Sequence, residues 1–378
     1  MERVRSYEQH LAGTLTDTKQ EKEGRKMNLN EILTAAIQKG ASDIFIIAGI
    51  PVTYKIKGTQ DRHGDSIMKP DAINTVIDEI YETGHRAKTN LDMNNDDDFS
   101  FSIRDLGRFR VNVFRQRGSL AAVIRVIKFG VPDPALLGIP ENVLSLAENN
   151  TGLVLVTGAA GSGKSTTLAC MIDRINRTRE AHIITMEDPL EYLHSHKRSI
   201  VSQREIFIDT PGYLESLRSA LRESPDVILL GEMRDFDTIS SAITAAETGV
   251  LLFSTLHTSS AANTINRIVD VFPANQQVQV RGQLAQLIKG VVCQQLITSA
   301  DGHLIPVFEV MKSTPAISNM IREGKLHQLE SAMHAAAADG MVTMDSSLLD
   351  LYRQGKITKN TLLSSCNNYE FMVKKVGA

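Results

Sequence analysis

The pattern of hydrophobic and polar positions divides the chain into regions of different character. Up to about residue 128, helical spacing of apolar residues is interrupted by short stretches in which apolar and polar residues alternate, as in half-buried strands. Alternating strands that follow one another closely favour an antiparallel sheet, so residues 27–128 are predicted to form an α+β domain. The predicted elements are helices at 29–37 and 69–83 and strands at 44–47, 52–56, 99–103, 108–114 and 120–127.

A segment rich in proline and glycine, residues 129–140, is predicted to be a linker. Beyond it the apolar runs no longer alternate, which is typical of strands covered on both faces. Helical patterns separate these runs, so residues 141–378 are predicted to hold a parallel sheet flanked by helices. Beyond about residue 274 we expect mostly helices, with one short strand pair around Leu296 and Val307. The strand-like runs lie at 153–156, 182–186, 227–230 and 250–253.

Composition and charge exclude several classes of protein. The 378 residues include 41 basic and 44 acidic side chains, and this near-balance does not favour nucleic acid as a partner. No apolar run approaches the roughly 20 residues of a membrane-spanning helix, and no secretory signal opens the chain. The three cysteines lie far apart, which favours a reducing cytoplasm over a disulfide framework or a cysteine zinc site. Residues 1–26 are charged and polar, and we expect a flexible leader to which no function is assigned.

The octapeptide GAAGSGKS follows an apolar strand and opens a helix, which is the setting that a phosphate-binding loop requires. Its glycines let backbone N–H groups face phosphate oxygens, and the helix N-terminus adds partial positive charge. Lys164 is predicted to reach the β- and γ-phosphates, and the Ser165 hydroxyl to ligate Mg²⁺. The predicted nucleotide-binding residues are Gly158, Ala159, Ala160, Gly161, Ser162, Gly163, Lys164, Ser165 and Thr166.

Carboxylates follow two further strands, at the sheet edge where ligands bind in open α/β proteins. Glu232 ends the strand PDVILLGE and is predicted to hold Mg²⁺ directly or through water. Glu187, Asp188 and Glu191 follow another strand, and one of them could orient or deprotonate the attacking water. Helix capping and surface solvation are the alternative for this cluster. His257, after the fourth strand, is either a γ-phosphate sensor or a core histidine with internal partners.

Arginines are also required, because negative charge develops on the transferred phosphoryl group. Several lie in the last strands of the first domain, and another domain or subunit can supply such a group. From the residues alone, the solvated face of a sheet is the favoured interpretation. These arginines are Arg108, Arg110, Arg115, Arg117 and Arg125.

Several motifs in one order resemble the secretion-superfamily ATPases, and most closely the type IV pilus retraction (PilT-like) motors. The resemblance covers about residues 27–345 and includes both domains. In the second domain the motifs are GAAGSGKSTT, ITMEDPLEY, DVILLGEMRD, AAETG, STLHTSSAANTINRIVDVFP and AISNMIREGK, and in the first domain they are ASDIFIIAGIPVTYKIKG and GRFRVNVFRQRG.

The resemblance implies a homohexamer whose subunits join a PAS-like N-terminal domain to a RecA-like ATPase domain, with ATP and Mg²⁺ between the two. It assigns catalytic roles to Glu191 and Glu232, matches His257 to the histidine box, and matches Arg110 and Arg125 to arginines near the phosphates. The expected function is pilus retraction by ATP hydrolysis at the cytoplasmic face of the inner membrane. The expected partners are a membrane-embedded platform protein and, as a further candidate, a paralogous pilus ATPase.

The chain departs from the family pattern in two of these motifs. Val250 replaces a second histidine, and Ser318 and Met320 replace the usual Arg and Leu of the AISNMIREGK segment. An accessory retraction paralogue therefore stays open, as does an extension or type II secretion motor, although the four-cysteine zinc region common in those motors is absent. Alternatives of other classes are a nucleic-acid-acting RecA-like ATPase, a non-catalytic nucleotide switch and a small-molecule kinase.

Overall fold

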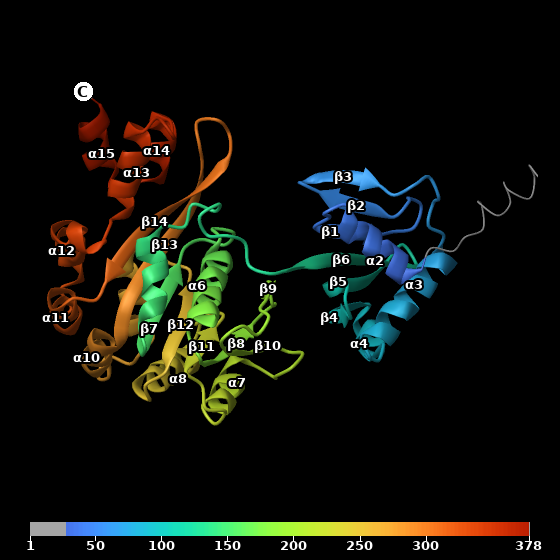
Figure 1. The fold of residues 1–378 in the computed structure, drawn as a ribbon, viewed down its shortest axis with the longest axis horizontal. Helices are drawn as coiled ribbons and strands as arrows, with labels where there is room; N and C mark the ends of the chain where they lie inside the picture. Colours follow the sequence, from blue (N-terminus) through green and yellow to red (C-terminus); the bar gives the residue numbers. More distant parts are fainter. Residues whose placement is uncertain (1–27, 378) are drawn as a thin grey trace, which may run out of the picture. The chain divides into compact units, whose positions relative to one another are not determined.

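The computed structural model describes residues 28–377, and the chain divides into two compact units between Lys128 and Phe129 (Figure 1). The leader predicted for residues 1–26 lies outside the described residues. Within 28–377, no helix is both long enough and apolar enough to cross a membrane.

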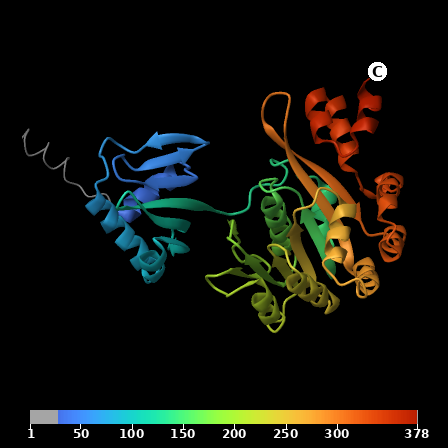
Figure 2. The same ribbon diagram turned by 180° about the vertical axis from the view of Figure 1, so that it is seen from behind.

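The N-terminal unit is an antiparallel sheet in the order β3-β2-β1-β6-β5-β4, packed against helices α2 and α3 (Figure 2). The predicted α+β class is confirmed. In β5, buried and less buried residues alternate, with Phe109, Val111 and Val113 turned into the core. The bounds are α2 Leu29–Gln38, β1 Asp43–Ile46, β2 Thr53–Ile56, β3 Thr59–Arg62, α3 Pro70–Thr83, α4 Thr89–Asn94, β4 Asp96–Ile103, β5 Gly107–Gln116 and β6 Ser119–Phe129.

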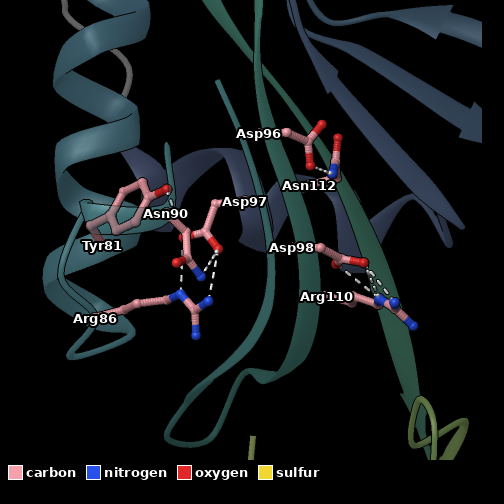
Figure 3. A network of polar contacts seen from close by, with 8 residues as sticks. All are labelled: Tyr81, Arg86, Asn90, Asp96, Asp97, Asp98, Arg110 and Asn112. Carbon is pink, nitrogen blue, oxygen red and sulfur yellow. Dashed lines mark hydrogen bonds and ion pairs between the residues drawn. The ribbon is translucent and has the colours of Figure 1, made fainter. Parts of the chain in front are cut away.

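A buried aspartate joins the helices of this unit to strand β4 (Figure 3). Asp97 accepts hydrogen bonds from Arg86 Nε at 2.9 Å and Nη2 at 2.7 Å, from the Tyr81 hydroxyl at 3.0 Å and from Asn90 Nδ2 at 3.3 Å. Burial by itself would raise the pKa of Asp97, but the bonds from Arg86 and Tyr81 outweigh it and lower that pKa. This carboxylate therefore stays ionised and binds α3, α4 and β4 together.

The second unit is built on a seven-stranded sheet in the order β10-β8-β11-β12-β7-β13-β14, and only β13 and β14 pair antiparallel. The predicted parallel sheet with flanking helices is confirmed (Figure 1). The strand and α-helix bounds are α5 Glu141–Leu144, β7 Gly152–Thr157, α6 Lys164–Thr178, β8 His182–Glu187, β9 Tyr192–Leu193, β10 Ile200–Glu205, α7 Tyr213–Ala220, β11 Val227–Leu230, α8 Phe236–Glu247, β12 Leu251–Leu256, α9 Ala261–Asp270, α10 Gln277–Leu287, β13 Ile288–Thr298, β14 Leu304–Lys312, α11 Pro315–Glu323, α12 Leu329–Ala335, α13 Met344–Arg353, α14 Lys359–Ser365 and α15 Tyr369–Val376. Short 3₁₀ turns lie at Ser145–Glu148, Leu326–Gln328 and Ala337–Asp339.

Both faces of this sheet are covered, which explains why its strands are apolar throughout. Leu153 and Leu155 of β7 join a core with helices α7 to α10 and the C-terminal helices, whereas Val154 and Val156 join a second core with α5 and α6. All six residues of β7 are buried. The carboxyl end of β7 therefore carries the phosphate loop on a rigid support.

The expectation of a short strand pair near Leu296 and Val307 is wrong in its extent. Strands β13 and β14 contain 11 and 9 residues, and β13 joins the sheet beside β7. Polar residues within β13, among them Gln294, interrupt its apolar run. The apolar run therefore underestimates the length of this strand, which lies inside the sheet between β7 and β14.

Candidate active site

The GAAGSGKS loop connects the end of β7 to the start of α6, and its glycines take the conformations that the motif requires. Gly158, Gly161 and Gly163 have φ angles of 144°, 76° and 88°. A Cβ on Gly158 would lie 2.2 Å from the carbonyl oxygen of Gln294, and a Cβ on Gly163 would lie 2.9 Å from the side-chain Nε2 of Gln294. The loop thus rests directly on β13, and side chains at these two positions would displace it.

Lys164 is buried at the start of α6, and its ammonium group lies within the loop. Its Nζ donates hydrogen bonds to the carbonyl oxygens of Gly158 and Ala159, both at 2.9 Å. Burial lowers the pKa of Lys164, while the negative charges of Glu232 and Glu191 oppose that shift. A cation held in a glycine cradle at a helix N-terminus suits the phosphates of a nucleotide.

A cavity opens beside Lys164, at the carboxyl ends of β8, β11 and β12. The sheet edge brings together groups that are far apart in the sequence, as expected for a parallel α/β fold. Four carboxyl groups and two histidines share this cavity with the loop. Its polar lining comprises Lys164, Ser165, Glu187, Asp188, Glu191, Tyr192, His194, Tyr213, Glu232, Arg234, Thr255 and His257.

Glu232 is the most constrained of these acids. One oxygen lies 2.7 Å from Arg234 Nη2, and the other lies 3.8 Å from His257 Nε2. Its side chain is 15% exposed, whereas that of His257 is 50% exposed. The histidine therefore borders solvent, and a buried core role for His257 is wrong.

Glu187 differs from its neighbours because its carboxyl group is poorly solvated. Burial raises the pKa of Glu187 to about 7, and the nearby charge of Glu191 adds to the shift. Burial also raises the pKa of Tyr213, with contributions from Glu232, Asp188 and Glu187. The Tyr213 hydroxyl thus lies among these acids.

Most of the predicted nucleotide-binding residues line two cavities beside the loop. Ala160, Gly161, Lys164 and Ser165 line the cavity that contains the acids. Gly158, Ala159 and Ser162 line a second cavity on the Gln294 side, to which His257 also contributes. Two residues line neither of these cavities. Gly163 is the N-cap of α6, and the hydroxyl of Thr166 lies 2.9 Å from that of Tyr192.

Arg110 and Arg125 lie in the N-terminal unit, on β5 and β6. Arg110 Nη2 lies 2.6 Å from Asp98, and Arg125 Nε lies 3.1 Å from Asp43 (Figure 3 shows the first pair). The Arg125 side chain is 69% exposed. Both guanidinium groups are therefore ion-paired within their own unit.

Sequence reasoning missed three residues that shape the site. Tyr213 begins α7, a short helix without a recognisable motif. Arg234 stands two residues after Glu232, in a motif whose recognisable feature is its acid. Gln294 supports the loop from β13 and also accepts a hydrogen bond from Thr167 Oγ1 at 2.7 Å. A polar residue within an apolar strand was the only available signal for Gln294.

Comparison with known proteins gives consistent matches. The model of a family described as type II/IV secretion system protein matches residues 18–367. The type IV pilus retraction ATPase PilT of Pseudomonas aeruginosa is 43% identical over 333 residues, 88% of this chain and 96% of that protein. The type IV pilus ATPase PilU of the same bacterium is 38% identical over 353 residues, 92% of each. A crystal structure of the pilus retraction motor PilT with bound ADP matches with a TM-score of 0.83 at 44% identity, covering 91% of this chain and 98% of that one.

Proposed function

We propose a mechanism for a chain that belongs to the type II/IV secretion system family and is an ATPase that powers type IV pilus retraction. One observation carries the mechanism: Lys164, Glu191, Glu232 and His257 line a single cavity beside the glycine loop. The loop amides and Lys164 bind the phosphates of ATP, because the cradle provides N–H donors and one ammonium group at a helix N-terminus.

Mg²⁺ fits the same cavity. The Ser165 hydroxyl and the Glu232 carboxylate both line it, and oxygen ligands of this kind are those that Mg²⁺ prefers. Ser165 and Glu232 would hold the ion, which when bound neutralises charge on the phosphates. Arg234 restrains Glu232 on the side away from His257.

Glu191 is the residue that orients and deprotonates the attacking water, and His257 senses the γ-phosphate. Glu191 is exposed at the rim of the cavity, where water reaches it. The products are ADP and phosphate. Because ADP lacks the contacts made to the γ-phosphate, hydrolysis changes the equilibrium between conformations of the subunit.

Replacing each acid by its amide tests these roles. Glu191→Gln and Glu232→Gln should each lower kcat for ATP hydrolysis by about 100-fold, because each removes a charge without changing side-chain size. Glu180→Gln, at an exposed carboxylate paired with Arg198, is the matched control and should keep wild-type turnover. Wild-type turnover in both cavity variants would contradict the assignment.

Arg110 and Arg125 are proposed to complete the site of a neighbouring subunit in a homohexamer. The support is the exposure of Arg125 and the need for positive charge on the phosphoryl group. Mixing inactive Lys164→Ala subunits with inactive Arg110→Ala or Arg125→Ala subunits tests this. Recovered turnover in the mixture shows that the arginine acts on a neighbour's nucleotide, and no recovery shows that it acts within its own subunit.

The proposed site of action is the cytoplasmic face of the inner membrane, against a pilus platform protein. The support is the similarity to PilT and PilU, which are pilus ATPases by name. Deleting the gene separates the candidate roles. Over-piliated, non-twitching cells indicate the principal retraction motor, unchanged piliation indicates an accessory paralogue, and bald cells indicate an extension motor.

A further inference from the structure

One buried carboxylate outside the nucleotide cavity binds the first turns of two helices. Glu309 lies on β14 and is 5% exposed. Its Oε1 accepts a hydrogen bond from the backbone N–H of Ala261 at 2.7 Å, and its Oε2 accepts one from that of Met344 at 3.2 Å. These are the first residues of α9 and α13. A single side chain therefore joins the two helix starts to the sheet.

Ordinary helix capping does not account for this arrangement, because both helices already have capping residues. Ser260 accepts from the N–H of Asn263, and Thr343 from that of Ser346. The first N–H of each helix is a separate donor without a partner inside the helix. Glu309 satisfies both of these donors, one with each of its carboxyl oxygens.

A thiol continues the network to the strand that carries the phosphate loop. Cys293 lies opposite Glu309 in the β13–β14 register, so the two buried side chains are neighbours on one face of the sheet. The Sγ of Cys293 in turn accepts from Thr157 Oγ1 at 3.2 Å. Thr157 is the last residue of β7, directly before the loop. Glu309 thus connects the loop strand, α9 and α13 through short, buried contacts.

Helix α9 follows the loop that contains His257, whereas helix α13 begins the C-terminal helices. Only three residues separate His257 from the first residue of α9, so a displacement of the His257 loop reaches Ala261 immediately. Helix α13 opens the C-terminal helices α13 to α15, and β14 runs into α11, which contains most of the AISNMIREGK segment. Glu309 lies where these two parts meet.

We propose that Glu309 is a positioning residue for ATP hydrolysis, whose carboxylate holds the His257 loop through α9 and makes α13 move together with it. A buried carboxylate that loses one N–H partner is left partly unsatisfied, so separate movement of either helix is disfavoured. The proposal rests on the proposed role of His257 toward the γ-phosphate.

Glu309→Gln in the full chain tests the positioning role. The amide keeps the side-chain size but has one acceptor oxygen instead of two, so one helix start loses its bond. We expect kcat to fall by about tenfold or more, and the preference for a nonhydrolysable ATP analogue over ADP to shrink, while ADP affinity stays within about twofold. Glu330→Gln is the matched control, because Glu330 is exposed and lines the surface cavity beside Glu309.

A purely structural Glu309 would change only the melting temperature. If kcat and the ATP-over-ADP preference of Glu309→Gln both stay within about twofold of wild type well below that temperature, the proposal is overturned. Loss of activity in Glu330→Gln of the same size would overturn it as well.

Hydrogen exchange on the wild-type chain provides a second test that does not depend on a variant folding. Adding a nonhydrolysable ATP analogue, compared with ADP, should change exchange in residues 258–264 and 341–347 together. A change in only one of these segments, or in neither, overturns the coupling. Wild-type turnover in His257→Ala would remove the proposed role of His257, whereas the joint exchange response would still support Glu309.

Discussion

The two units of this protein differ in how the negative charge of their buried carboxyl groups is compensated. In the N-terminal unit, the buried Asp97 is matched by a guanidinium, a phenol and an amide, and its pKa is lowered. In the ATPase unit, four carboxyl groups share one cavity with Lys164, and the pKa of Glu187 is raised to about 7. The matched charge of Asp97 stabilises the N-terminal unit, whereas the acids of the cavity are proposed to serve phosphate and metal binding.

The largest effect is expected from removing the positive charge of Lys164 in the cavity of the ATPase unit. Lys164→Ala should lower ATP turnover by about 100-fold or more, because the ammonium group is the positive charge placed inside the phosphate loop. Unfolding temperature should change little, since Lys164 bonds only to loop carbonyls. Turnover by coupled phosphate release and a thermal melt measure the two effects. Near-normal turnover would contradict the nucleotide assignment.

The hydrogen-bond network around Asp97 can be broken by removing the guanidinium group of Arg86. Arg86→Met should destabilise the N-terminal unit by about 3 kcal/mol at neutral pH, because Asp97 is left buried with its charge unmatched. A lowered carboxyl pKa gives stability that is present above about pH 4 and lost as the pH falls further, so the deficit should shrink toward pH 3.

Hydrogen exchange of β4 and β5 measures this loss without interference from the second unit. Asp98→Asn is the control, because that carboxylate belongs to a more exposed pair with Arg110 and should cost less than about 1 kcal/mol. Equal losses of stability in Arg86→Met and Asp98→Asn would contradict the prediction, because they would mean that the buried pair stabilises the unit no more than the exposed one.

A third prediction concerns Glu187 and the pH dependence of the free energy of unfolding. Its folded-state pKa of about 7 lies above the ordinary 4.5, so its contribution to stability is present below pH 4.5 and is lost as the pH rises through 7. Glu187→Gln should therefore match wild type near pH 4 and exceed it by about 2 kcal/mol at pH 8.5. Thermal melts at both pH values measure the difference. Glu180→Gln, at an exposed carboxyl group, should show the same small change at both.

Local sequence determined the parts of the site that depend on a single loop or strand end. The glycine loop, the acid that follows β11 and the apolar strands around them could all be predicted, because each is specified by neighbouring residues. The catalytic roles of Glu191, His257, Arg110 and Arg125 stay predictions.

Long-range packing accounts for what could not be predicted. The sequence does not predict strand β10, because β10 is an edge strand, where Ser202, Gln203 and Arg204 need not be apolar. Tyr213 and Gln294 contribute to the site from α7 and β13. The sequence around each of them contains no motif that predicts these contacts.

The contact between the phosphate loop and Gln294 has a consequence for synthesis on the ribosome. Loop residues 158–165 leave the exit tunnel long before the strand that supports them, since Gln294 is more than a hundred residues further along. A nascent chain that ends before β13 has the complete motif but lacks the surface against which Gly158 and Gly163 are seated. The supported form of the loop therefore exists only after most of the ATPase unit has been synthesised.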